Sequence, residues 1–229
     1  MITVFSSNGV RAVLLDLAPE FERRTGHTLA ITFDPANALK ERIARGETFD
    51  AAILTPPVMA EMIAQEKIVS GSPRTIARVG CGLAVRAGGA KPDTATVDGF
   101  KRTLLAAKSI ARTRVGASGI HFTHLIKTLG IADAVDRKSR FVAGGLTAEL
   151  AASGETELAV QLISELKAVA GVDIVEFPAP LQEYVVMVGG VSAAAKEPQT
   201  AAALLAVLSG PDAAPVLRAK GMEPAQSQN

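Results

Sequence analysis

The chain has 229 residues, 48% of them hydrophobic, and its 24 basic and 23 acidic side chains leave a formal net charge of +1. This balance gives no electrostatic basis for binding nucleic acid, and a chain with one Tyr and no Trp lacks base-stacking surfaces. The single cysteine, Cys81, excludes an internal disulfide. No apolar run reaches the length of a membrane span, so we expect no direct membrane insertion.

The first residues predict a strand that delivers a loop of small polar residues to a helix. Residues 2–5 are mostly β-branched or aromatic, and from Val10 the apolar residues recur at helical spacing. The four residues between them, Ser-Ser-Asn-Gly, are turn and N-cap types. Such a junction is either an ordinary capped turn or an anion site built from free backbone N–H groups.

Strands and helices then alternate. Further strands are predicted at 29–33 and 51–54, each followed by a helix, an order typical of a parallel sheet with right-handed crossovers. Ligands of such sheets bind at the carboxyl ends of the strands. The loop 34–38 lies at one of these ends, and its Asn37 is either a helix cap or a ligand-binding amide.

Two extended segments without an intervening helix, at 74–86 and 184–188, predict crossings between two lobes. We therefore expect one lobe from residues 1–78 plus 190–229 and a second from 79–189. The end of the chain beyond Pro224 is expected to be frayed.

The second lobe repeats the pattern of the first. A strand at 109–113 leads through the small-residue loop RVGASG into a helix over 120–129, so that Ser118 and Gly119 form a second candidate anion site. The other elements predicted after residue 90 are helices at 97–107, 164–168, 198–208 and 213–219, a helix ending near Ala152, and short strands at 141–142, 157–161 and 172–177.

These elements resemble the type II periplasmic-binding-protein fold, in the molybdate-binding (ModA-like) branch of extracellular solute-binding proteins. The resemblance implies an α/β fold of two lobes with a ligand cleft between them, and a solute-binding protein that captures a small anion for the membrane component of an ABC transporter. Because a strand begins at residue 2, we expect a periplasmic location if a signal peptide has been removed and a cytoplasmic one otherwise. The segments that carry the resemblance are EFERRTGH (20–27), ALKERIARGETFDAAI (38–53), ASGIHF (117–122), GLTAELAASGETELAV (145–160) and LSGPDAAPVLRAKGM (208–222).

Three places depart from the molybdate-binding pattern, which has a serine just before the first helix, a serine-rich second loop and a tyrosine after the late short strand, where this chain has Gln161 and Ser164. This chain has Gly9 at the first position and no hydroxyl in the loop 34–38. Arg112 and Arg114 flank the second-lobe junction and are either solvated charges or guanidinium clamps, which grip carboxylates bidentately. We therefore expect a carboxylate ligand rather than molybdate. The candidate ligand-binding residues are Ser6, Ser7, Asn8, Gly9, Asn37, Arg112, Arg114, Ser118, Gly119 and Gln161.

Two other functions are open. Some proteins similar to this group isomerise small polycarboxylates by proton transfer, for which His121 and Glu165 are the candidate acid–base residues. A ligand-sensing module is the third possibility, although no helix-turn-helix accompanies it. His121 and His124 lie three residues apart, but no carboxylate or cysteine pattern joins them, so we expect no metal and no other cofactor.

Overall fold

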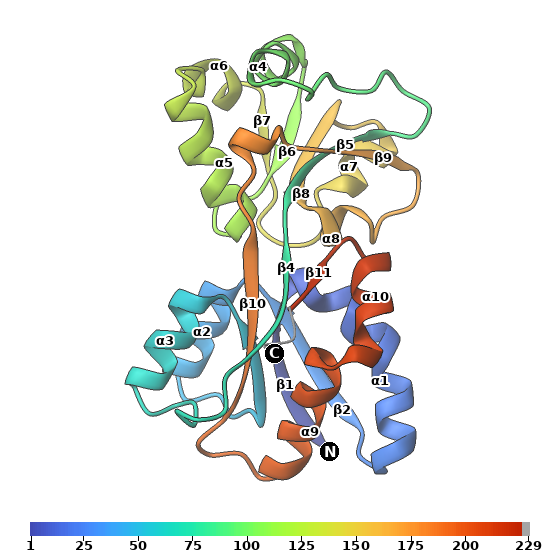
Figure 1. Cartoon of the computed structure of the whole chain (residues 1–229). Helices are drawn as coiled ribbons and strands as arrows, with labels where there is room; N and C mark the ends of the chain where they lie inside the picture. Colours follow the sequence, from blue (N-terminus) through green and yellow to red (C-terminus); the bar gives the residue numbers. More distant parts are fainter. Residues whose placement is uncertain (226–229) are drawn as a thin grey trace. The chain divides into compact units, whose positions relative to one another are not determined.

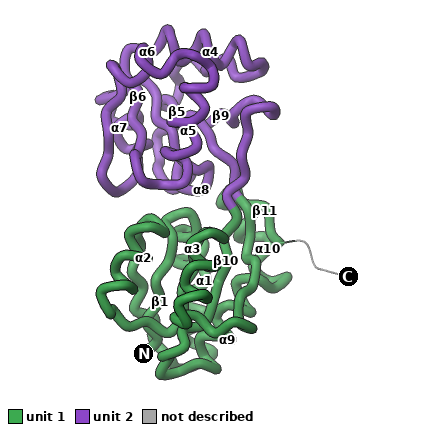
Figure 2. The backbone as a smooth tube through the Cα atoms, turned by 90° about the vertical axis from the view of Figure 1, so that its left-hand side faces the viewer, with its two compact units in different colours: residues 1–78, 186–229 green, residues 79–185 purple. Residues whose placement is uncertain are grey.

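A computed structural model describes residues 1–225 and contains helices and two separate β-sheets (Figure 1). The chain divides into two compact units, the first made of residues 1–78 and 186–229 and the second of residues 79–185 (Figure 2). The first unit is therefore built from both ends of the chain, and the second is inserted between them. The α/β class predicted from the sequence is confirmed.

The strands are β1 (Ile2–Ser7), β2 (Leu29–Asp34), β3 (Ala51–Leu54), β4 (Arg74–Val79), β5 (Cys81–Arg86), β6 (Ile110–Arg112), β7 (Ser139–Phe141), β8 (Leu158–Leu162), β9 (Val172–Glu176), β10 (Val185–Val191) and β11 (Glu223–Pro224). The helices are α1 (Arg11–Thr25), α2 (Ala36–Ala44), α3 (Pro56–Ala64), α4 (Val97–Ala106), α5 (Ala117–Thr128), α6 (Ala132–Asp136), α7 (Ala148–Ser153), α8 (Ile163–Leu166), α9 (Pro198–Ser209) and α10 (Ala214–Ala219). Short 3-10 turns cover Asn8–Val10, Ala179–Leu181 and Pro211–Ala213.

The sheet of the first unit has the strand order β11-β4-β10-β3-β1-β2. β1 pairs in parallel with β2 and with β3, while β10 pairs antiparallel with β3. Helices cover both faces, because Gly189 faces Leu205 of α9 and the next residue, Gly190, faces Met59 of α3. β3 is accordingly buried along its whole length. The carboxyl ends of the three parallel strands meet at one edge of the sheet.

The sheet of the second unit has the order β7-β6-β8-β5-β9, with β6 parallel to β7 and to β8. α7 and α8 pack on one face over an alanine-rich core. Successive residues of β6 point to opposite faces, so that Ala111 faces α7 whereas Arg112 faces α5. The carboxyl ends of β6, β7 and β8 again share one edge, from which α5, α7 and α8 begin (Figure 1).

Some predicted boundaries are wrong by a turn. α5 begins at Ala117 and not at 120, because the small residues before Ile120 form its first turn. The first helix is preceded by a 3-10 turn over Asn8–Val10. α6 and β11, five and two residues long, are absent from the sequence prediction because such short elements have no measurable hydrophobic period.

The predicted frayed end falls mainly on residues 226–229, which lie outside the described residues. Ala225, just before them, donates its backbone N–H to the Ile76 carbonyl at 3.0 Å. Among residues 1–225, no single helix combines the length and the apolar character of a membrane span. One pair of helices in that part of the chain, Pro198–Ser209 and Pro211–Ala219, passes a test of length and composition when its two members are taken together, but the pair is bent by 53°.

Candidate functional site

The strongest candidate site lies where β6 leads into α5. The helix begins after Gly116, which offers no side-chain cap, so the N–H groups of its first turn have no partner within the helix. These groups and the helix dipole favour a negative charge at this point. The junction is tight, because a Cβ atom on Gly119 would lie 2.5 Å from the Thr113 hydroxyl oxygen. Glycine is therefore required at position 119, and the backbone of the first turn is left uncovered by a side chain.

Two hydroxyls at this junction are not used by the fold. Ser118, in the first turn of α5, is 2% exposed and makes no hydrogen bond to the described residues. The Thr113 hydroxyl is buried and has no partner among them either. A buried polar group without a partner costs about 1–3 kcal/mol. This unused hydrogen-bonding capacity favours an anion site over a plain helix cap.

Arg112 is neither the ligand clamp nor the solvated charge that the sequence predicts. Its side chain is 2% exposed, and its Nε donates to the Ser139 hydroxyl at 2.9 Å. One terminal nitrogen donates to the Thr123 hydroxyl at 2.8 Å, and the other pairs with the Asp136 carboxylate. Burial lowers the pKa of Arg112, and Asp136 opposes that effect. Every guanidinium nitrogen is engaged inside the unit, so Arg112 is a structural residue.

Arg114, two residues further, has the opposite character. Its side chain is exposed, and its guanidinium carbon lies 3.5 Å from the centroid of the Phe141 ring. The Arg112 guanidinium lies 4.6 Å from the same centroid. No ion pair of Arg114 exists among the described residues. The expectation that Arg114 contacts a ligand stays a prediction, now with a defined position for its charge.

Gln161 holds a loop of the site. Its amide oxygen accepts hydrogen bonds from the Thr147 N–H at 2.8 Å and the Thr147 hydroxyl at 3.0 Å, and its amide nitrogen donates to the Gly145 carbonyl at 3.1 Å. These bonds fix the loop that joins β7 to α7. The predicted role of Gln161 as a ligand contact is therefore replaced by a positioning role, because its oxygen and nitrogen are both engaged.

Glu165 lies in α8, directly after the carboxyl end of β8, and is buried. Burial raises the pKa of its carboxyl to about 7, and hydrogen bonds from the Leu162 N–H and the Gln161 side chain oppose the rise. A carboxyl group with such a pKa can take up and release a proton near neutral pH. The prediction of Glu165 as an acid–base residue thus gains an electrostatic basis.

His121 is less suited to that role. Its Nε2 lies 3.0 Å from the Leu181 carbonyl oxygen and its Nδ1 lies 2.5 Å from a Glu183 carboxylate oxygen. Both ring nitrogens therefore face oxygen atoms of the segment that precedes β10. Both nitrogens thus have partners inside the unit, and the acid–base role of His121 stays a prediction.

The predicted residues of the first unit lie at the end of β1. Ser6 donates its hydroxyl to the Ser7 carbonyl at 3.1 Å, so it serves the backbone. Ser7 precedes the 3-10 turn that contains Asn8 and Gly9, and its side chain makes no capping bond. The four predicted residues, 6–9, thus lie together at the carboxyl edge of the sheet.

Asn37 is not the helix cap that was one of the two roles predicted for it, and its role as a ligand-binding amide stays a prediction. It is the second residue of α2, its side chain is exposed, and the N-cap position belongs to Pro35. Proline has no side-chain oxygen and cannot cap a helix. The helix therefore starts without the cap that the sequence suggested.

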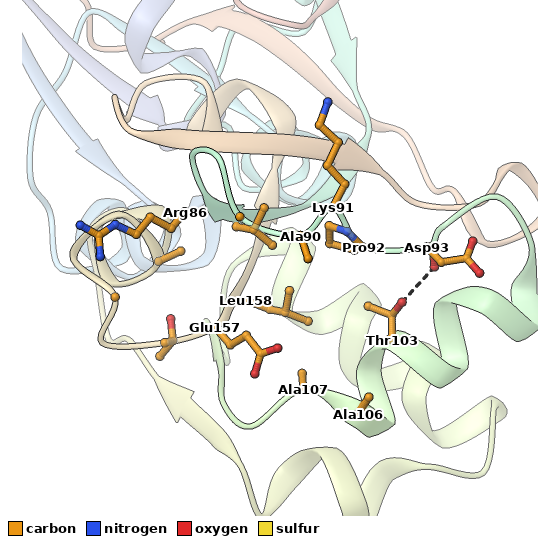
Figure 3. A pocket seen from close by; sticks show the side chains of 15 residues that line it. Arg86, Ala90, Lys91, Pro92, Asp93, Thr103, Ala106, Ala107, Glu157 and Leu158 are labelled. Carbon is orange, nitrogen blue, oxygen red and sulfur yellow. Dashed lines mark hydrogen bonds between the residues drawn. The ribbon is translucent and has the colours of Figure 1, made fainter.

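A cavity of about 420 Å³ lies on another part of the second unit (Figure 3). Its lining includes Ala107, just before β6, and Leu158, at the start of β8, so it lies at the amino edge of these strands. The Glu157 carboxylate in it accepts the Lys108 N–H at 2.7 Å, and Lys91 extends away from the other labelled side chains. Parallel sheets bind ligands at the opposite edge. This cavity is therefore not the primary candidate site.

The described residues contain no cluster of three or more His, Cys, Asp or Glu side chains that could hold a metal ion.

Sequence reasoning missed Thr113 and Phe141. A threonine after a strand and a phenylalanine in a three-residue strand carry no pattern of their own. Only the packing of β6, β7 and α5 reveals their position.

The chain was compared with known proteins. Residues 2–223 match the family model described as bacterial extracellular solute-binding protein. An aconitate isomerase from Pseudomonas sp. is 30% identical over 99% of this chain and 89% of its own length. The molybdate-binding protein ModA from Azotobacter vinelandii is 26% identical over 92% of this chain and 84% of its own length.

A solved structure shares the fold. The periplasmic molybdate-binding protein of Azotobacter vinelandii superposes with a TM-score of 0.84, covering 99% of this chain and 100% of its own, at 20% sequence identity. At that identity, the likeness concerns the fold alone. The predicted resemblance to the ModA-like branch is confirmed.

Proposed function

The chain belongs to the family of bacterial extracellular solute-binding proteins, and from this premise we propose that it binds a small carboxylate. The observation that carries the proposal is the β6–α5 junction, where the first turn of α5 has no side-chain cap and the Ser118 hydroxyl has no partner among residues 1–225. Backbone N–H groups at a helix N-terminus bind carboxylates as well as oxyanions.

The preference for a carboxylate over molybdate rests on the surroundings of the two junctions. The loop 34–38 has no hydroxyl, and Arg114 places a guanidinium beside the second-unit junction. Guanidinium groups match the planar geometry of a carboxylate. The relative with 30% identity is named an aconitate isomerase, and aconitate is a carboxylate.

As a partner we propose the membrane component of an ABC transporter, and as a location the periplasm, both consistent with the extracellular family.

Titration calorimetry on the purified chain tests the proposal with citrate, succinate, propionate, sulfate and molybdate. We expect a carboxylate to bind more tightly than molybdate and sulfate. Ser118→Ala should weaken that carboxylate about fivefold, which corresponds to one neutral hydrogen bond of about 1 kcal/mol. Thr128→Ala, at the other end of α5, is the matched control and should bind normally. Tight molybdate binding with no carboxylate binding would overturn the proposal.

A second candidate function is favoured by one observation, the buried Glu165 carboxyl with a pKa of about 7. In an isomerase of a small polycarboxylate, Glu165 would remove a proton from carbon and return it elsewhere on the same molecule. Incubating the chain with cis- or trans-aconitate and following their interconversion tests this function. Turnover that disappears in Glu165→Gln supports it, and binding without turnover leaves the binding protein as the function.

A further inference from the structure

We infer that Arg114, held against Phe141, selects ligands that carry a second carboxylate. The inference rests on the proposed function and deepens it: one carboxylate occupies the first turn of α5, and Arg114 takes the other. The juxtaposition that carries it is a guanidinium 3.5 Å from the Phe141 ring centroid at the edge of the sheet where α5 begins.

The charge balance at this edge points to a missing anion. Arg112 and Arg114 approach the same ring, and Arg112 has a counter-ion in Asp136. Arg114 has none among the described residues. Two like charges with one counter-charge leave an excess positive charge, and it lies on the exposed guanidinium of Arg114. An anionic group of a ligand would neutralise it.

The stacking contact explains why this charge can select a ligand. A free arginine side chain on the surface loses rotamer entropy when it binds, which offsets much of the gain. Contact with an aromatic face attracts the guanidinium and restricts the motion of its side chain before a ligand arrives. Phe141 is therefore a positioning residue, and the Arg114 side chain that it holds stays exposed.

A dicarboxylate has one anionic group for each of the two anion-binding groups at this edge. α5 follows β6, whereas Phe141 ends β7, the neighbouring parallel strand in register with it. The helix turn follows β6, and the ring that holds the guanidinium ends the neighbouring strand β7, so both anion-binding groups lie at the same edge of the sheet. A monocarboxylate can engage only one of the groups.

Calorimetric titration of succinate and propionate into wild type, Arg114→Gln, Arg114→Lys and Arg137→Gln tests the inference. Arg137 is an exposed arginine of the same unit without an ion pair among the described residues, so its variant controls for net charge. We expect Arg114→Gln to weaken succinate about tenfold and propionate less than twofold, since only succinate can form a charged hydrogen bond to Arg114 while its other carboxylate occupies the helix turn. Arg114→Lys should fall between, and Arg137→Gln should match wild type.

Phe141→Leu tests the positioning role through the ratio of succinate to propionate affinity, which a purely structural role would leave unchanged. If Phe141 positions Arg114, the ratio of succinate to propionate affinity should fall several-fold, whereas a loss of packing alone would lower both affinities equally. Equal ratios in Arg114→Gln and Arg137→Gln would overturn the inference while leaving carboxylate binding in place. A wild type that binds neither acid nor any other carboxylate would overturn the proposed function, and the inference with it.

Discussion

The guanidinium of Arg112 and the carboxylate of Asp136 form an ion pair between a side chain that is 2% exposed and one that is 50% exposed. The pair joins β6 to the end of α6, and the same guanidinium also reaches Ser139 and Thr123. A charge so deeply placed is tolerated only when all of its donors are matched. Arg112 therefore ties α5, α6 and β7 to the sheet of the second unit.

Replacing Arg112 is expected to affect stability before binding. Arg112→Ala removes the hydrogen bonds to Ser139 and Thr123 and leaves a void on the α5 face, so we expect a loss of about 3 kcal/mol in the free energy of unfolding. Arg140→Ala, which breaks the exposed pair with Glu155, is the control and should cost less than about 1 kcal/mol. Urea denaturation measures both. A fully stable Arg112→Ala with weakened ligand binding would restore the clamp hypothesis.

Glu165 should make the stability of the second unit depend on pH. Its pKa is about 7 in the folded chain and near 4.5 when unfolded, so the folded state holds a proton that the unfolded state has released between these values. Stability from this group is therefore greatest below pH 4.5, falls as the pH rises to about 7, and is level above. Over this pH range the free energy of unfolding is expected to fall by about 3 kcal/mol. Glu165→Gln should remove this slope in urea titrations between pH 4.5 and 8. A slope unchanged by the substitution would contradict the assignment.

Cys81 should be inert in the folded protein. It is buried in β5, and burial raises the pKa of its thiol to about 12, with Glu183 and Glu165 adding to the rise. The thiolate, which is the reactive form, is then scarce at pH 8. We expect a thiol reagent to label the chain only after unfolding by guanidinium chloride. Rapid labelling of the folded chain would show that β5 opens locally.

Asp50 should be a stability determinant of the first unit. It is 5% exposed, and its carboxylate accepts the Thr3 N–H at 2.8 Å and the Lys196 N–H at 2.7 Å. Asp50→Ala leaves these two N–H groups without an acceptor, which we expect to cost about 3 kcal/mol. The exposed Asp212→Ala serves as the control and should unfold at the same urea concentration as the native chain. Equal midpoints for the two variants would show that water replaces the lost acceptor.

The sequence by itself determined the succession of elements and the class of fold. The alternation of short apolar strands such as 51–54 with helical periods reports local backbone preference and burial, which a chain carries in its own order of residues. The small-residue loops before α1 and α5 were visible for the same reason, since serine, asparagine and glycine have strong local preferences at helix starts.

Only the tertiary structure decided what the charged and polar side chains do. Arg112 and Arg114 are two residues apart and look alike in the sequence, yet one is buried against Asp136 and the other is exposed on Phe141. The difference depends on which residues of α5, α6 and β7 are brought beside β6. Such partners are distant in the chain, and a charge takes its pKa and its availability from them rather than from its neighbours in the sequence.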